Sequence, residues 1–242
     1  MVDLKIPMSP TVKKTNFKGT AEYSLCILKY LKNKYKDSCI IIPKLKKSKN
    51  LKHTDVSLRW IQINEKEGHF SVPDNYWDIF SSCINKRFVV FPFGFSCSNF
   101  MGHANFMIYD RKTKSLERFE PYGKTLRKCS NPVNLDTKMK KLFNDNLGDD
   151  FVQKYYQPLD FMSKESFQRQ QEYENQVKKD DPKGGFCVAW SCWYAELRLS
   201  NPDKCRNYIV KNAFKKLKEE ESLTQYIRNY SAYIVKECKL CK

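Results

Sequence analysis

The sequence predicts a single α+β domain, in which a mixed β-sheet packs against one buried helix and further helices occupy both ends of the chain. Hydrophobic residues make up 41% of the 242 residues and aromatic residues 14%, which is typical of a folded globular protein. Segments with helical spacing of apolar residues alternate with short apolar runs typical of strands. We see no internal repeat and no clear linker. Residues 19–242 are therefore expected to form one domain, preceded by a flexible polar segment over residues 1–18.

The first part of the chain alternates between helical and extended patterns. AEYSLCILKYLKNKY has apolar residues at helical spacing, whereas SLRWIQI has the alternation of a strand. Pro92 and Gly94 are expected to break the apolar strand that contains them. The expected elements are a helix over 21–35, a β-branched run over 39–43, a strand over 57–63, a helix over 75–84 and a buried strand over 87–95.

The middle of the chain predicts a β-hairpin. HANFMIYD (103–110) and SLERFEPYG (115–123) are strand-like and are separated by a polar turn, RKTK. A helix over 135–146 and a strand over 151–162 are expected next. Residues 163–183 are almost free of apolar residues, so we interpret them as an exposed loop or a surface helix.

GGFCVAWSCWYAELRLS, over 184–200, predicts the most apolar helix in the chain. It is apolar nearly all round, which indicates a buried central element. Trp190 and Trp193 are expected in its core contacts. Two amphipathic helices, over 206–220 and 223–237, complete the prediction.

The cysteines and the termini indicate an intracellular protein. Ten cysteines in a chain that is neither small nor visibly secreted are expected to be reduced thiols. Several lie in or beside apolar runs, including Cys26, Cys39 and Cys83. No run approaches the ~18 to 20 apolar residues of a membrane span, and the N-terminus lacks the order of a secretory signal. The lone C-x-x-C at Cys238 and Cys241 has no second pair at zinc-site spacing, so we expect no metal.

The formal net charge of +17 indicates a surface that attracts polyanions. Nucleic acid is therefore one candidate partner. The excess is mostly lysine scattered along the chain, without an RNA-recognition or zinc-finger signature, and lysine-rich coding bias explains it equally well. The charge indicates partners and says little about chemistry.

Cys187 has the surroundings that activate a thiol. The paired glycines Gly184 and Gly185 deliver it to the first turn of the apolar helix. There the helix dipole and unpaired backbone N–H groups favour a thiolate and can also stabilise a developing oxyanion. The alternative is that Cys187 is a core residue like Cys192.

A histidine and a carboxylate of the hairpin are candidate partners for this thiol. If the hairpin turns about Arg111 and Lys112, His103 lies directly opposite Glu120. Opposed residues on antiparallel strands have Cβ atoms about 4.5–5.5 Å apart, so the carboxylate is within reach of the imidazole. A solvated glutamate beside an ordinary edge-strand histidine is the alternative for this pair.

The combination GHAN…ERFEPYG…GGFCVAWSC resembles the ubiquitin-like-protein proteases, which include the SUMO-specific Ulp/SENP enzymes and the adenovirus protease. That family has a histidine, an acidic residue or asparagine about seventeen positions later, and a cysteine well downstream. Here Glu120 follows His103 by seventeen positions, and Cys187 follows in the same order. The resemblance covers about residues 85–200 and is greatest to members from large cytoplasmic DNA viruses. It implies a papain-like, Ulp-type fold and a Cys-His-Glu triad.

Around Cys187 the sequence matches part of the family's cysteine motif. Gly184 and Cys192 agree with it, whereas Val188 replaces a glycine, and Ala104 replaces the tryptophan that follows the histidine. The family's oxyanion-hole glutamine, six residues before the cysteine, is Asp181 here, and an anionic carboxylate would oppose an oxyanion. Gln168 is the preferred substitute donor, and Gln171 is a weaker candidate.

The resemblance implies a thiol protease that cleaves peptide or isopeptide bonds after Gly-Gly or Gly-x. The substrate would be a ubiquitin-like modifier conjugate or a viral structural precursor. No cofactor is implied, and we expect a monomer located in the host cytoplasm or a viral factory, or packaged in the virion. A basic nucleic-acid-binding or packaging protein and a catalytically inactive protease-like scaffold remain as alternatives, the latter because of Asp181 and Ala104.

Overall fold

The computed structural model describes residues 19–46, 54–64, 67–97, 100–123, 133–162, 166–176, 186–220 and 222–238, with isolated positions 6, 10, 11 and 17. Most of the segment 1–18 that we predict to be flexible lies outside the described residues. So do Asp181, Gly184, Gly185 and Cys241. Within the described residues the predicted α+β architecture is confirmed: a mixed sheet packs against a buried cysteine-bearing helix, and further helices occupy both ends of the chain.

Helices and strands follow one another in the order that the sequence patterns predict, with several short additions. The helices are α1 (Ala21–Lys34), α2 (Tyr76–Cys83), α3 (Val133–Leu147), α4 (Pro158–Phe161), α5 (Phe167–Gln176), α6 (Phe186–Ser200), α7 (Arg206–Glu220) and α8 (Leu223–Glu237). The strands are β1 (Cys39–Ile40), β2 (Lys44–Lys46), β3 (Thr54–Val56), β4 (Leu58–Gln62), β5 (Gly68–Ser71), β6 (Phe88–Cys97), β7 (Phe100–Asp110), β8 (Ser115–Phe119) and β9 (Lys154–Tyr156).

The main sheet is mixed. In the part of the chain that the structure describes, its strand order is β5-β4-β6-β7-β8-β9, and β1 pairs with the start of β6. β6 and β7 are antiparallel, as are β7 and β8, whereas β1 and β4 run parallel to β6, and β9 runs parallel to β8. The two longest strands therefore lie at the centre of the sheet.

β6 continues through Pro92, where a break is expected from the sequence. The strand pairs with β1 as far as Val90 and with β4 from Phe93 onward, so Pro92 falls between these two neighbours. The Val90 carbonyl accepts from Ile41 on that same side. Because alternate residues of a strand point their backbone groups to the same side, the N–H that proline lacks would lie in the gap between β1 and β4. The expected break is absent for this reason.

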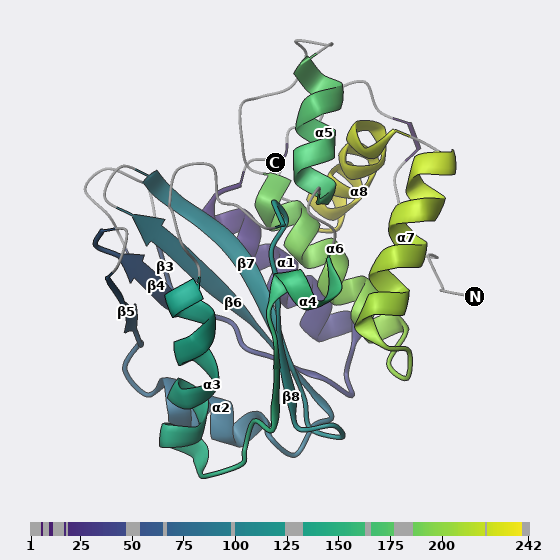
Figure 1. Ribbon diagram of the computed structural model, residues 1–242. Coiled ribbons are helices and arrows are strands. Elements are labelled where there is room, and N and C mark those ends of the chain that lie inside the picture. The colour runs from purple at the N-terminus through teal and green to yellow at the C-terminus, as the bar shows by residue number, and fades with distance from the viewer. Residues whose placement is uncertain are drawn as a thin grey trace.

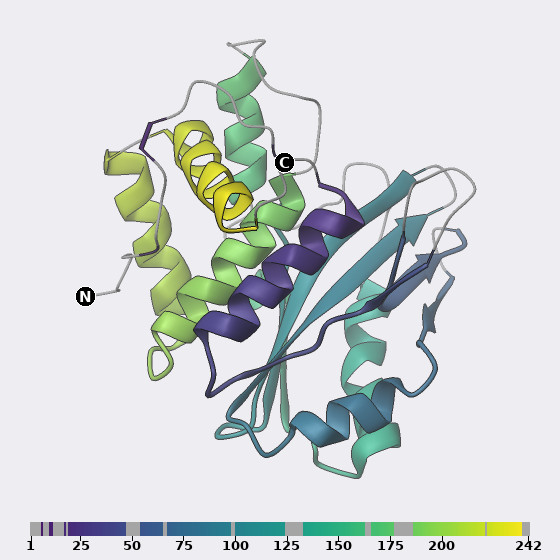
Figure 2. The ribbon, with the colours of Figure 1, turned by 180° about the vertical axis from the view of Figure 1, so that it is seen from behind.

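Helices cover both faces of the sheet (Figures 1 and 2). α6 lies against β7 and is surrounded by α1, α5, α7 and α8, while α2 and α3 cover the opposite face. Trp190 and Trp193 of α6 are completely buried, as expected for core residues. The ring of Tyr194 stacks on Phe119 of β8 with ring centroids 4.2 Å apart. α6 is thus fixed between the sheet and the other helices.

Two further element predictions are corrected. The expected strand over 151–162 is short, because Pro158 begins the helical turn α4 directly after β9. The segment 163–183 contains α5, and this helix is not simply a surface helix. Phe167 and Gln171 are buried against α6 and α8, and Gln168 is buried beside Tyr122, which follows β8. The sequence pattern does not predict this buried face, because two of its three residues are glutamines.

The expectation of reduced thiols is also corrected. Cys26 is bonded to Cys238, and Cys39 to Cys83, with Cα–Cα distances of 5.8 and 5.5 Å. The partners are separated by 212 and 44 residues in sequence, so local spacing gives no sign of either pair. Cys187, Cys192 and Cys205 are free cysteines. No helix within the described ranges is long and apolar enough to cross a membrane.

Candidate active site

His103 and Glu120 form a buried pair at the open end of the β7–β8 hairpin. His103 Nε2 lies 2.5 Å from Glu120 Oε1. His103 is 4% exposed and Glu120 2%. The pairing expected from the sequence is therefore present, and its partners are shielded from water.

The register that led to this expectation is wrong by two residues. Asp110 pairs with Ser115 and Phe106 with Phe119, because the turn takes up all four residues from Arg111 to Lys114. By extension of this register Glu120 faces Asn105, and His103 lies one diagonal position away on the same face. Diagonal neighbours remain within reach of long side chains, and the Glu120 side chain is long enough to contact His103.

Cys187 completes the group from a third element. It is the second residue of α6 and is partly buried. Its sulfur is hydrogen-bonded to the His103 ring and to the backbone N–H of Ala104. Since Nε2 of His103 contacts Glu120, Nδ1 is the ring nitrogen that remains for the thiol. Ser191 Oγ donates to the Ala104 carbonyl at 3.3 Å, which fixes α6 against the strand that carries the histidine.

The charges of the three groups favour an imidazolium–thiolate pair. Burial alone lowers the pKa of His103, but the Glu120 carboxylate and the Cys187 sulfur raise it to about 10. Burial raises the pKa of Cys187, but His103 and the Ala104 N–H bring it below its usual value. Burial likewise raises the pKa of Glu120, and His103 and Arg118 lower it further than burial raises it. The shifts of His103 and Cys187 therefore act in the same direction, toward a charged histidine beside a thiolate.

Glu120 is also held by groups other than the histidine. Its Oε1 accepts the backbone N–H of Tyr122 at 2.9 Å. Arg118 Nη1 lies 3.7 Å from its Oε2 and donates to Asn105 Oδ1 at 3.0 Å. The guanidinium makes a bidentate pair with Asp136 of α3, with distances of 3.0 and 2.8 Å. Sequence reasoning missed this network, although three charged or long polar side chains within SLERFE are a signal of buried polar contacts.

The candidate oxyanion donors lie on α5. Gln168 is buried, and its Nε2 donates to Tyr122 Oη at 3.1 Å. The Tyr122 ring lies against His103, with ring centroids 5.2 Å apart. Gln168 is thus linked to the imidazole through Tyr122, which contacts both residues. Gln171 instead accepts from the Trp190 indole at 3.1 Å, and Asp181 lies outside the described residues.

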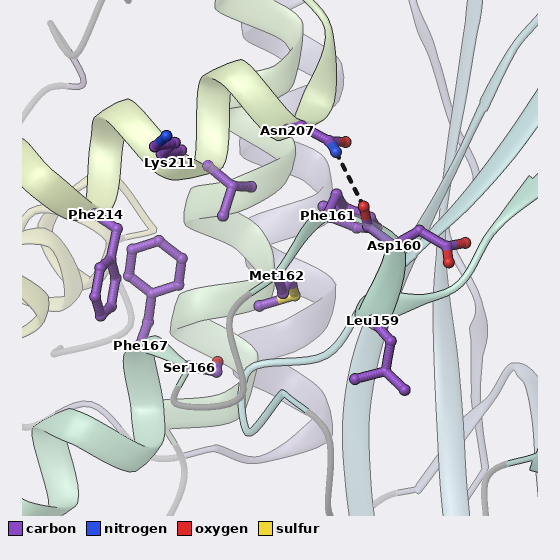
Figure 3. A pocket seen from close by; sticks show the side chains of 10 residues that line it. Leu159, Asp160, Phe161, Met162, Ser166, Phe167, Asn207, Lys211 and Phe214 are labelled. Carbon is purple, nitrogen blue, oxygen red and sulfur yellow. Dashed lines mark hydrogen bonds between the residues drawn. The ribbon is translucent and has the colours of Figure 1, made fainter.

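A cavity of about 320 Å³ lies at a different place, between α4, α5 and α7 (Figure 3). Asn207 spans one side of it and donates to the Asp160 carbonyl at 3.0 Å. None of His103, Glu120 and Cys187 lines this cavity. Its wall is mostly apolar and consists of Leu159, Asp160, Phe161, Met162, Ser166, Phe167, Asn207, Val210, Lys211 and Phe214. Among the described residues, no group of three or more histidine, cysteine or acidic side chains is arranged to hold a metal ion.

No protein-family model matches the chain. It is similar to a protein of Acanthamoeba polyphaga mimivirus described as an ankyrin repeat protein, with 28% identity over 244 residues. That similarity covers 91% of this chain and 32% of the mimivirus protein, so the chain spans about a third of the length of that relative.

Among solved structures the chain is similar to bacterial effector proteins. ChlaDub1 of Chlamydia trachomatis matches with a TM-score of 0.48 and 9% identity, over 99% of this chain and 96% of that one. RavZ of Legionella pneumophila has a TM-score of 0.46 and 10% identity, over 97% and 71%. The Chlamydia trachomatis effector Cdu1, solved bound to ubiquitin, has a TM-score of 0.42 and 12% identity, over 95% and 84%.

Proposed function

We propose that this chain is a thiol protease that hydrolyses peptide or isopeptide bonds through Cys187, His103 and Glu120. The observation that carries the proposal is that one buried imidazole contacts both a carboxylate and a thiol at the start of a helix. This is the arrangement that acyl transfer through a cysteine requires: a nucleophile, a base within reach, and a group that orients the base.

In the proposed reaction the Cys187 thiolate attacks the carbonyl carbon, and a C–S bond forms. The C–N bond then breaks as His103 transfers its proton to the leaving amine, which leaves an acyl-enzyme. Water attacks this thioester, His103 accepts a proton from the water, and the thiolate leaves as the acid product departs. Glu120 holds the ring and stabilises the imidazolium in both steps. No further reactant is needed besides water.

The developing oxyanion would be stabilised by the backbone N–H of Cys187 and by a side-chain amide. Gln168 is the better candidate, because among the described residues only one of its two amide hydrogens is engaged, with Tyr122. Gln171 is the weaker candidate, because its side chain is directed at the core, where its oxygen accepts from the Trp190 indole.

The proposed substrates contain Gly-Gly or Gly-x before the bond that is cleaved, in a ubiquitin-like modifier conjugate or a viral precursor. The order and spacing of His103, Glu120 and Cys187 support this choice. The Ulp-type assignment of the fold belongs to the same proposal.

The direct test is reaction with a panel of electrophilic probes built on ubiquitin, on SUMO and on Gly-Gly-x peptides, with the labelled cysteine mapped by mass spectrometry. We expect labelling of Cys187 and its loss in Cys187→Ala. Cys205→Ala is the matched control, since Cys205 is a free and exposed cysteine, and this variant should react as the parent protein does. Labelling that is lost in the control and kept in Cys187→Ala would contradict the proposal.

A nucleic-acid-binding or packaging protein is the second candidate, supported by the net charge of +17. Such a protein would bind DNA equally well before and after alkylation of Cys187. An inactive scaffold, the third candidate, would bind a ubiquitin-like protein without reacting with its electrophilic form.

A further inference from the structure

Arg118 is a fully buried cation between two buried carboxylates. Its side chain is 2% exposed, and the side chains of Glu120 and Asp136 are 2% and 7% exposed. The guanidinium pairs bidentately with Asp136, while its remaining nitrogen, Nη1, lies 3.7 Å from Glu120 Oε2 and bonds to Asn105. A bidentate fork of this kind leaves the guanidinium little freedom to turn away.

The two oxygens of Glu120 have different surroundings. Oε1 contacts both His103 and the Tyr122 N–H. Oε2 is buried and has no hydrogen-bond partner in the described part of the chain, so the Arg118 charge at 3.7 Å is its nearest compensation. A buried carboxylate oxygen without such compensation favours the protonated acid.

Groups from every neighbouring element bear on the charge of Glu120, directly or through one intermediate. They are His103 on β7, Arg118 on β8, Asp136 on α3, Tyr155 on β9, Cys187 on α6 and Glu172 on α5. Tyr155 donates to Asp136 Oδ1 at 2.5 Å, and Glu172 accepts from the Tyr122 hydroxyl. Arg118 and His103 are the two cationic groups of this set.

We propose that Arg118 is a positioning residue of the active site, which keeps Glu120 charged and directed at His103 while Asp136 holds the guanidinium in place. This inference rests on the proposed function for its importance, because Glu120 matters to catalysis only if His103 acts on Cys187. Arg118 does not touch the reacting atoms. It acts through Glu120 and then through the imidazole.

The sign of the effect follows from the charges. Removing Arg118 leaves Glu120 and Asp136 as two buried anions without their shared cation, so the pKa of Glu120 rises. A neutral Glu120 supports the imidazolium less, and the thiolate then forms only at higher pH. Asp136→Asn removes the charge of Asp136 but keeps an amide oxygen that still accepts from Arg118, so the guanidinium stays beside Glu120 and the thiolate forms at lower pH. The two changes break the same ion pair but move the thiolate in opposite directions.

The test is the pH dependence of Cys187 alkylation by iodoacetamide in the full chain, followed peptide by peptide with Cys205 as the internal reference. Arg118→Met should move the midpoint of Cys187 alkylation upward by about one unit or more, and so slow the reaction about tenfold below that midpoint. Asp136→Asn should move the midpoint downward, and Arg118→Lys, which keeps the charge but not the bidentate fork, should move it upward by less than Arg118→Met does. An unmoved midpoint in Arg118→Met, or shifts of the same sign in both variants, would mean that the ion pair only supports the fold.

If Arg118→Met does not fold, the alkylation midpoint of Cys187 in Asp136→Asn tests the inference alone. A downward shift supports the inference, and an upward or absent shift overturns it. The measurement needs no substrate, so the two proposals fail separately. If Cys187 in the parent titrates no lower than an ordinary thiol, the proposed protease fails. If it titrates low but is insensitive to Arg118, only the positioning role fails.

Discussion

His103 Nε2 lies 2.5 Å from Glu120 Oε1, although the two residues are not opposite each other in the β7–β8 ladder. The contact runs diagonally across the hairpin and is completed by the length of the glutamate side chain. A shorter aspartate would reach less far from the same backbone position. The two residues are seventeen positions apart in sequence, and the four-residue turn together with the diagonal contact brings their side chains together.

We predict that Cys187→Ala abolishes hydrolysis of Gly-Gly-containing substrates, with a loss of at least about 10⁴-fold in kcat/KM. Folding should be little affected, because the side chain is small and only partly buried. The measurement is release of a reporter from a Gly-Gly substrate, with circular dichroism as the check on folding. An unchanged rate in this variant would remove the basis for the whole assignment.

His103→Ala should be as inactive as Cys187→Ala, whereas Glu120→Gln should keep partial activity. The amide can still accept from the imidazole and fix its orientation, but it lacks the charge that stabilises the imidazolium. We expect a loss of about 10²-fold or more in kcat for Glu120→Gln, short of the loss in Cys187→Ala. Equal activity of Glu120→Gln and the parent protein would show that the carboxylate has no part in catalysis.

The pH dependence of kcat/KM should have its alkaline limb near pH 10. Catalysis needs the protonated imidazole, and the Glu120 carboxylate and the Cys187 sulfur raise the pKa of His103 to about 10. Activity is then retained through neutral pH and lost as pH rises through about 10. Glu120→Gln removes part of this effect, so its alkaline limb should move to lower pH. An alkaline limb near 6.5 in the parent would show that His103 does not carry the raised pKa.

Much of the fold was predictable from the sequence. α1, α2, α6, α7 and α8 follow from apolar residues at helical spacing, and the β7–β8 hairpin follows from two strand-like runs around RKTK. The candidate site was predictable to the extent that His103, Glu120 and Cys187 were named, and the structure brings these three together. Their catalytic roles stay a prediction.

Other features depend on distances that a linear sequence does not contain. The buried face of α5 was missed because Gln168 and Gln171 are polar, and their burial depends on partners that come from the hairpin and from α6. The Arg118–Asp136 pair joins β8 to a helix eighteen residues later, and nothing in the spacing marks it. The register error had a similar cause, since a turn of two residues and one of four fit the same polar run.

Tyr122→Phe tests the link between α5 and the histidine. The change removes the hydroxyl that accepts from Gln168 and donates to Glu172, and it leaves the ring against His103. We expect kcat to fall about five- to tenfold with little change in KM, because the proposed oxyanion donor loses one anchoring hydrogen bond.

The matched control for this change is Tyr173→Phe on the exposed side of the same helix, where the hydroxyl accepts from Arg169 at 3.2 Å. This variant should keep the kcat of the parent. If the two substitutions lowered kcat equally, Gln168 would have no specific part in the reaction.

Trp190→Ala should be among the most destabilising single substitutions in the chain, because Trp190 is completely buried and its indole donates to Gln171. Loss of the side chain leaves a cavity and an unpaired buried amide oxygen, which together lower the free energy of unfolding by about 3–5 kcal/mol. Tyr208→Ala is the control, since Tyr208 is 41% exposed and its loss should change this free energy by less than about 0.5 kcal/mol. Urea denaturation of both variants measures the difference. A cost below about 1 kcal/mol for Trp190→Ala would show that α6 is not the rigid central element on which the placement of Cys187 depends.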